Sequence, residues 1–227
     1  MTVDLIIFDC DGVLVDSEPL AMRVLVAAIS AQGITVSPDV AYRDFLGRSL
    51  ASISTSLLDS HGAPLGPATL ASMRHDLYAL YRQELRPSPG LPEILGQLKI
   101  PFCVASSSEL ERIRLSLELT GLLPWFEPHI FSASMVENGK PAPDLFLHAA
   151  HQMGVHPSRC LVIEDSPAGI AAARNAGMAV FAYTGGSHIV PSGLTAAIAA
   201  LGPDAIFDDM HALPDRLSSW RTEKKAP

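Results

Sequence analysis

The chain has 227 residues, a formal net charge of −8 and only 16 lysine and arginine residues. This length is enough for one buried α/β core with a smaller accessory domain. The charge argues against a nucleic-acid partner, and the first residues lack the apolar and basic segments of a membrane or export signal, which predicts a cytoplasmic protein. Cys10, Cys103 and Cys160 are scattered among apolar residues, which predicts reduced thiols in the core.

The first predicted strand covers residues 5–8, where four apolar residues lead into two acids, Asp9 and Asp11. A continuous apolar run is typical of a strand buried on both faces. Residues two apart in an extended chain point to one side, so both carboxylates are expected to face one small space at the carboxyl end of this strand. Such a pair needs a cation or a shared proton, although an acidic turn at Gly12 would explain the same residues.

The next part of the chain, to residue 85, carries helical patterns without a convincing strand. Ser17 is a plausible N-cap for the first helix, which is expected to end near Gly33. Further helical patterns cover residues 38–46, 50–61 and 67–85. A stiff segment rich in proline, residues 86–90, follows and is suited to a linker. Residues 17–86 are therefore expected to form a helical insertion after the first strand.

From residue 102 onward, predicted strands alternate with predicted helices. The strands are expected at residues 102–105, 130–131, 160–163, 179–183 and 205–207, and the helices at residues 110–119, 143–153 and 168–176. This alternation is typical of βαβ crossovers and a parallel sheet. The expected fold is an α/β core formed by residues 1–16 and 87–227, with the helical insertion as a lid above the carboxyl end of the first strand.

Three further polar clusters are predicted at the carboxyl ends of buried strands. They are the serines at 106–108, Lys140 in a loop before a helix, and Glu164 with Asp165. Each cluster alone is often just an N-cap or a turn. A parallel sheet, however, brings these strand ends side by side, so the clusters are expected to share one crevice with the first two acids.

The charges in this crevice indicate its chemistry. Four carboxylates, those of Asp9, Asp11, Glu164 and Asp165, would face one ammonium group. Such a pocket requires a hard divalent cation, and ligands that are all oxygen favour Mg²⁺ over zinc. A Mg²⁺ site with a lysine and hydroxyl donors suits a phosphoryl group in transfer, and a carboxylate can act as its nucleophile.

With these motifs the sequence resembles the haloacid dehalogenase superfamily, in the group of phosphatases and phosphomutases that carry a helical cap after the first strand. The resemblance extends over nearly the whole chain. Four motifs carry it, in order: DCDGVLVDSE at 9–18, ASS at 105–107, KPAPDLF at 140–146 and IEDSPAG at 163–169. The resemblance implies a Rossmann-like parallel sheet core with a helical-bundle cap, residues 17–86, and a Mg²⁺-dependent phosphatase. The acid at position 11 points to phosphate-ester chemistry.

The resemblance also implies a role for each acid. Asp9 would take the phosphoryl group as nucleophile and bind the metal. Asp11 would protonate the leaving alcohol, then activate water, and offer its backbone carbonyl to the metal. Asp165 would be the second carboxylate on the metal, with Glu164 acting beside it through water.

The remaining expected site residues bind the phosphoryl group or the rest of the substrate. Ser106 would donate a hydrogen bond to the phosphoryl oxygens, and Lys140 would neutralise the nucleophile and the developing charge. Ser107, Glu18 at the hinge into the cap, and Arg48 in the cap are expected to contact substrate. The ordinary explanation for Glu18 is an acid in the first turn of a helix, and that for Arg48 is a solvated arginine in a loop.

Two questions stay open at this level. The β-phosphoglucomutase branch carries a histidine in its first cap helix where this chain has residues 19–21, Pro-Leu-Ala, which favours hydrolysis over mutase activity. The predicted substrate is a small phosphorylated metabolite: a sugar or polyol phosphate, or phosphoglycolate. A mutase is the alternative enzyme, and a metabolite-binding or regulatory protein of the same fold is the alternative outside catalysis. His188 has no partner at ligand spacing and is expected to be a surface or core residue rather than a functional one.

Overall fold

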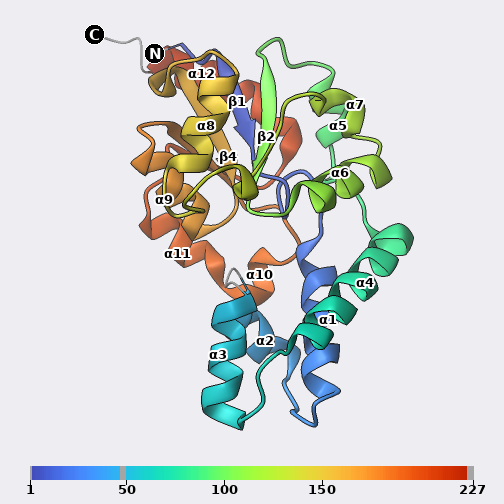
Figure 1. Ribbon diagram of the computed structural model, residues 1–227. Coiled ribbons are helices and arrows are strands. Elements are labelled where there is room, and N and C mark those ends of the chain that lie inside the picture. Colours follow the sequence, from blue (N-terminus) through green and yellow to red (C-terminus); the bar gives the residue numbers. More distant parts are fainter. Residues whose placement is uncertain (1, 47–49, 224–227) are drawn as a thin grey trace.

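A six-stranded parallel sheet lies at the centre of the computed structural model, which describes residues 2–46 and 50–223 (Figure 1). Its strands are β1 (Leu5–Phe8), β2 (Phe102–Ser106), β3 (Ile130–Ser132), β4 (Cys160–Glu164), β5 (Ala179–Tyr183) and β6 (Ala205–Phe207). The strand order is β3-β2-β1-β4-β5-β6, so β1 pairs with β2 on one side and with β4 on the other. The predicted parallel α/β sheet is confirmed.

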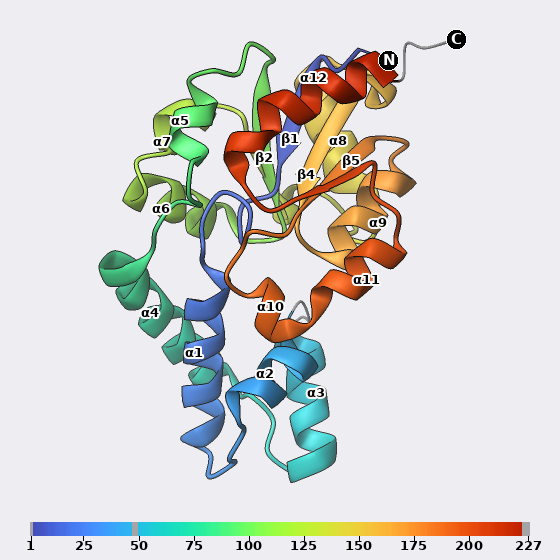
Figure 2. The ribbon, with the colours of Figure 1, turned by 180° about the vertical axis from the view of Figure 1, so that it is seen from behind.

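Helices cover both faces of this sheet (Figures 1 and 2). They are α5 (Leu91–Leu95), α6 (Leu110–Leu119), α7 (Leu123–Phe126), α8 (Asp144–Gln152), α9 (Pro167–Asn175), α11 (Leu194–Ala200) and α12 (Leu213–Glu223). A further short helix, α10 (Ile189–Ser192), lies below the sheet in both views (Figures 1 and 2). Ile6 and Phe8 of β1 pack in one apolar cluster with α5, α6, α7 and α12. Leu5 and Ile7 pack in a second cluster with α8, α9 and α11. Burial on both faces explains the unbroken apolar run of β1.

The chain between β1 and α5 forms a separate group of four helices, drawn below the sheet in both views (Figures 1 and 2). They are α1 (Glu18–Ser30), α2 (Pro38–Phe45), α3 (Leu50–His61) and α4 (Pro67–Glu84). These helices have an apolar cluster of their own, which includes Met22, Leu25, Ile29 and Ile53. The helices follow the predicted order, while the proposed boundary of a cap at residues 17–86 stays a prediction.

The two segments that join this helical group to the sheet lie side by side. Val15 pairs with Pro87 in an antiparallel bridge, and the Asp16 N–H donates to the Arg86 carbonyl at 3.1 Å. The helical group is therefore attached to the sheet by a pair of hydrogen-bonded segments just beyond the end of β1.

Five helices were not predicted from the sequence: α5, α7, α10, α11 and α12. Three of them have only four or five residues, which is too short for a helical period to be visible. The cysteines are buried and free, as predicted. Within the described ranges, no helix is both long and apolar enough to cross a lipid bilayer.

Candidate active site

Three acids meet where β1 and β4 end. Asp9 follows β1, Glu164 ends β4, and Asp165 comes next in the chain. One carboxylate oxygen of each lies within 4.8 Å of the others. All three residues are buried, with exposed fractions of 7%, 1% and 4% respectively. The pairing of β1 with β4 therefore brings together acids that are far apart in the sequence.

Lys140 reaches this cluster from the loop before α8. Its Nζ donates to Asp9 Oδ1 at 2.6 Å, to Glu164 Oε1 at 2.7 Å and to the Ala105 carbonyl at 3.2 Å. Burial lowers the pKa of Lys140, but the two carboxylates outweigh burial and hold that pKa above its ordinary value. Lys140 is thus a buried ammonium group that connects the ends of three strands.

The carboxyl groups of the three acids outnumber the one ammonium group, that of Lys140. Burial raises the pKa of Asp9 well above its ordinary value, Lys140 opposes that shift, and Glu164 and Asp165 add to it. Burial and Glu164 also raise the pKa of Asp165. A donor set made of carboxylate oxygens with excess negative charge is the kind that hard divalent cations bind. The residues present therefore fit a hard divalent cation.

Glu164 differs from its neighbours because both of its oxygens are engaged. Oε1 accepts from Lys140, while Oε2 accepts from the Asp165 N–H at 2.9 Å, the Ser166 N–H at 2.8 Å and the Ser166 hydroxyl at 2.9 Å. A side chain at Gly169 would enter this space, since its Cβ would lie 1.7 Å from Glu164 Oε1. The glycine in the fourth motif therefore provides room for a fixed carboxylate.

Asp11 lies in a second cluster, toward the helical group. Oδ1 accepts from the Ser17 hydroxyl at 2.6 Å and from Arg112 Nη2 at 2.9 Å, and Oδ2 accepts from the Ser108 hydroxyl at 2.6 Å. Burial raises the pKa of Asp11, but Arg112 and the two hydroxyls outweigh burial and hold that pKa below its ordinary value. Asp11 therefore accepts three hydrogen bonds, which favour its carboxylate form.

Ser17 and Arg112 differ from the sequence-based expectations. Ser17 precedes α1, but its hydroxyl makes no capping bond because its helical φ and ψ of −90° and −24° direct it elsewhere; it donates to Asp11. Arg112 was not predicted as a site residue. It lies on α6, and its guanidinium is 5.8 Å from the centroid of the Tyr81 ring on α4. The sequence feature that could have identified Arg112 is its place in the first turn of the helix that follows the serine cluster.

The three serines after β2 have different surroundings. Ser106 is 1% exposed, and its hydroxyl accepts the Ser108 N–H at 3.1 Å, which leaves its own proton available for donation. Ser107 is exposed. Ser108 donates to Asp11, as described above. Ser106 is thus buried, Ser108 is partly buried beside Asp11, and Ser107 is exposed.

Of the two substrate contacts expected from residues 17–86, the structure describes one. Glu18 is partly buried in the first turn of α1, where burial and Asp11 raise its pKa. Arg48 lies outside the described residues.

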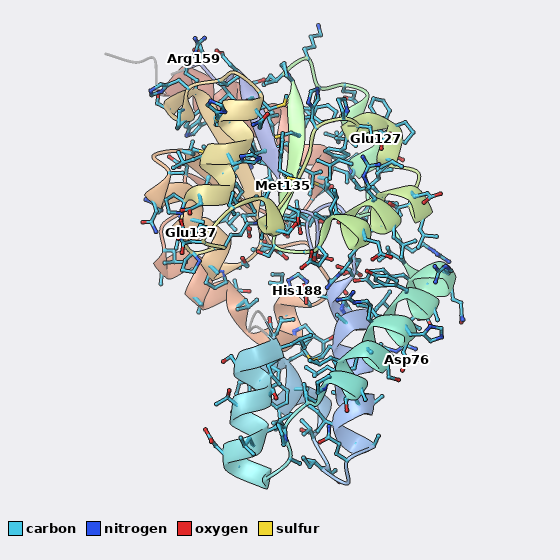
Figure 3. The ribbon with its side chains drawn as sticks, in the orientation of Figure 1. Asp76, Glu127, Met135, Glu137, Arg159 and His188 are labelled. Atoms are coloured by element: carbon cyan, nitrogen blue, oxygen red, sulfur yellow. The ribbon has the colours of Figure 1, made fainter. Side chains whose placement is uncertain are left out.

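His188, which has no partner at ligand spacing in the sequence, is a buried residue beside Asp165. Its Nε2 lies 3.0 Å from Asp165 Oδ2, and it is 2% exposed. Burial lowers the pKa of His188, which favours the neutral imidazole. Figure 3 shows His188 between the sheet and the helical group. No regular spacing in the sequence links it to Asp165, so the contact is visible only once the strands are assembled.

Comparisons with known proteins agree on one family. Residues 3–177 match the family of haloacid dehalogenase-like hydrolases. The 6-phosphogluconate phosphatase of Escherichia coli K12 is 31% identical over 190 residues, which cover 83% of this chain and 86% of that protein. The fructose-1-phosphate phosphatase YqaB of the same organism is 31% identical over 176 residues, with 76% and 92% covered. The solved structure of a haloacid dehalogenase-like protein of unknown function from Agrobacterium tumefaciens is 34% identical, with 96% and 99% covered and a TM-score of 0.84.

Proposed function

The chain belongs to the haloacid dehalogenase-like hydrolase family, and we propose that, as a phosphatase, it hydrolyses a small phosphorylated metabolite through an aspartyl-phosphate on Asp9. A sugar or polyol phosphate, or phosphoglycolate, is the proposed substrate. The observation that carries the proposal is the bond of 2.6 Å between the buried Lys140 ammonium and Asp9 Oδ1, beside two more carboxylates. A buried acid held beside a cation is suited to attack on a negatively charged phosphoryl group.

In the first step, a carboxylate oxygen of Asp9 forms a bond to phosphorus, and the ester bond between phosphorus and the leaving oxygen breaks. Lys140 favours the ionised form of Asp9 and offsets the charge that develops on the phosphoryl oxygens. Ser106 donates its free hydroxyl proton to one of these oxygens. Asp11 carries a proton into this step and delivers it to the leaving alcohol, which leaves the Asp11 carboxylate.

In the second step, water replaces Asp9 on phosphorus. Asp11 takes a proton from the water as its oxygen bonds to phosphorus, and the bond between phosphorus and Asp9 breaks, which releases phosphate and restores the carboxylate. The hydrogen bonds that hold the pKa of Asp11 low favour its carboxylate as the proton acceptor. The proton that Asp11 takes from water is the one that it delivers to the leaving alcohol in the next turnover.

Asp9, Asp165 and the backbone carbonyl of Asp11 would hold a Mg²⁺ ion, with Glu164 acting beside them through water. When bound, Mg²⁺ supplies positive charge that neutralises phosphoryl oxygens in the transition state. The excess of buried carboxylates over Lys140 supports this assignment.

Residues 17–86 form the proposed cap over the site. Glu18 and Arg48 from this segment, with Ser107 from the core, are proposed to contact the part of the substrate beyond its phosphate. The relatives named above as sugar-phosphate phosphatases support a substrate of this size. They do not favour the mutase, and the joint presence of the acids and Lys140 speaks against a protein that only binds metabolites.

Replacement of the nucleophile tests the mechanism. Asp9→Asn should abolish both Mg²⁺-dependent phosphate release and the acid-labile phosphoenzyme. The matched control is Asp76→Asn on α4, an exposed acid that Figure 3 shows away from His188, and it should keep wild-type turnover. Substantial activity in Asp9→Asn on an aryl phosphate would refute the mechanism.

A panel of sugar phosphates, polyol phosphates and phosphoglycolate, scored by released phosphate, tests the substrate class. β-Glucose 1-phosphate distinguishes the mutase alternative, because a mutase would form glucose 6-phosphate rather than free phosphate.

A further inference from the structure

His188 lies in a tightly packed place next to Asp165. Its loop follows β5 and ends where α10 begins, and Nε2 is 3.0 Å from Asp165 Oδ2. Two glycines lie against the imidazole: a Cβ at Gly12 or at Gly186 would be 2.8 Å or 2.6 Å from Cε1. The ring therefore fits between the loop after β1 and its own loop, where any larger residue would displace it.

The loop that carries His188 is anchored at points away from the acids. The Ser187 N–H and hydroxyl donate to Asp16 Oδ1 at 3.3 Å and 2.9 Å. Helix α10, which begins at the next residue, packs against α2 of the helical group. Gly185 lies close to the Asp208 carbonyl, since its Cβ would be 2.1 Å from that oxygen. These contacts hold the loop that carries the imidazole independently of Asp165.

The contact constrains the Asp165 carboxylate. Nε2 lies 3.0 Å from Oδ2, and where Asp165 is ionised the ring nitrogen is the group of the two that can carry the proton. This close contact restricts the rotation of the carboxylate and occupies one side of Oδ2. Nδ1, the other ring nitrogen, has no hydrogen-bond partner among the described residues. Asp165 is therefore the polar side chain that His188 contacts through a ring nitrogen.

We propose that His188 is a positioning residue that holds Asp165 so that it offers a cation one oxygen only. This inference rests on the proposed metal site. Mg²⁺ takes six ligands in a strict octahedron, whereas Ca²⁺ accepts more ligands and both oxygens of a carboxylate. A carboxylate restrained at one oxygen favours the smaller ion, and partners behind a ligand commonly set its affinity.

Three variants at one position separate this role from packing. Gln places an amide nitrogen near the position of Nε2, Asn is polar but too short to reach Asp165, and Leu removes the donor. The control is His211→Gln, because His211 forms a similar bond of 2.9 Å to Asp209 on the exposed surface. Calorimetric titration with MgCl₂ and with CaCl₂ measures the two dissociation constants of each intact protein.

We expect His188→Leu and His188→Asn to raise the Mg²⁺ dissociation constant by about 10- to 100-fold, and to raise that of Ca²⁺ less. His188→Gln and His211→Gln should stay near the wild type. If His188→Leu does not fold, the comparison of Gln with Asn still decides. Equal Mg²⁺ affinity in the Gln and Asn variants would overturn the proposal while leaving the metal site in place. A wild-type protein that binds no Mg²⁺ would refute the proposed metal site itself.

Discussion

Lys140→Met removes an ammonium group and keeps an unbranched side chain of similar length. The variant leaves Asp9 and Glu164 without a shared donor and also frees the Ala105 carbonyl. Because the Lys140 side chain is 4% exposed, bulk water cannot readily replace these bonds. The substitution thus creates uncompensated buried acids at the centre of the proposed site.

Removal of one partner from a buried ion pair costs about 3–5 kcal/mol of unfolding free energy, and this is the loss expected at pH 7 without metal. The loss should depend on pH. The pKa of Asp9 is raised on folding, so its contribution to stability is present at low pH and is lost as pH rises through the folded-state pKa. Lys140 lowers that pKa, so the variant moves this window upward, and its stability should continue to fall at pH values where the stability of the wild type has levelled off.

Urea unfolding in EDTA at several pH values measures both effects, with the exposed Lys99→Met as the control. Phosphate release in Mg²⁺ should fall by about 10²- to 10³-fold or more in Lys140→Met, because a donor to the developing charge is lost. A variant with wild-type stability at pH 7 and an unchanged dependence on pH would refute the reasoning about the buried acids.

Two further substitutions test the neighbouring contacts. Arg112→Met should lower turnover, because it removes a hydrogen-bond donor from Asp11. Arg112 holds the pKa of Asp11 low, so the loss of unfolding free energy in this variant, measured in urea, should shrink as pH falls through that pKa. The exposed control Arg114→Met should show neither effect. Gly12→Ala should lower the unfolding free energy in urea by about 1–3 kcal/mol, because φ is +82° at this position. It should also weaken Mg²⁺ binding in calorimetry, because the new Cβ would lie 1.8 Å from Asp165 Oδ2. Wild-type Mg²⁺ affinity in this variant would contradict the close packing of the loop after β1 against Asp165.

The parts of the fold that sequence predicts are those with a local signal. The apolar run of residues 5–8 is buried on both faces, as its pattern indicates, and strands that alternate with helices predicted the parallel sheet. Parallel pairing then explains why Asp9, Lys140 and Asp165 meet, because acids and amines that follow parallel strands reach the same edge. Their assigned roles in catalysis remain predictions.

Other parts of the site have no local signal. Arg112 and His188 contact acids 101 and 23 residues away, and no spacing along a helix or strand links the members of either pair. Ser17 has the residue type of a cap, but its backbone conformation turns its hydroxyl toward Asp11. Such contacts depend on how loops from different strands approach one another, which is a property of tertiary packing.

β1 lies in the middle of the sheet although it is the first strand along the chain. Its neighbours begin only at Phe102 and Cys160. Closing such long loops slows folding, and until they close, β1 has two open edges that other chains can pair with. A cation that needs Asp9 and Asp165 together can bind only after β4 has joined the sheet. Its binding would then draw the population toward the completed sheet by mass action and shorten the time during which β1 is exposed to aggregation.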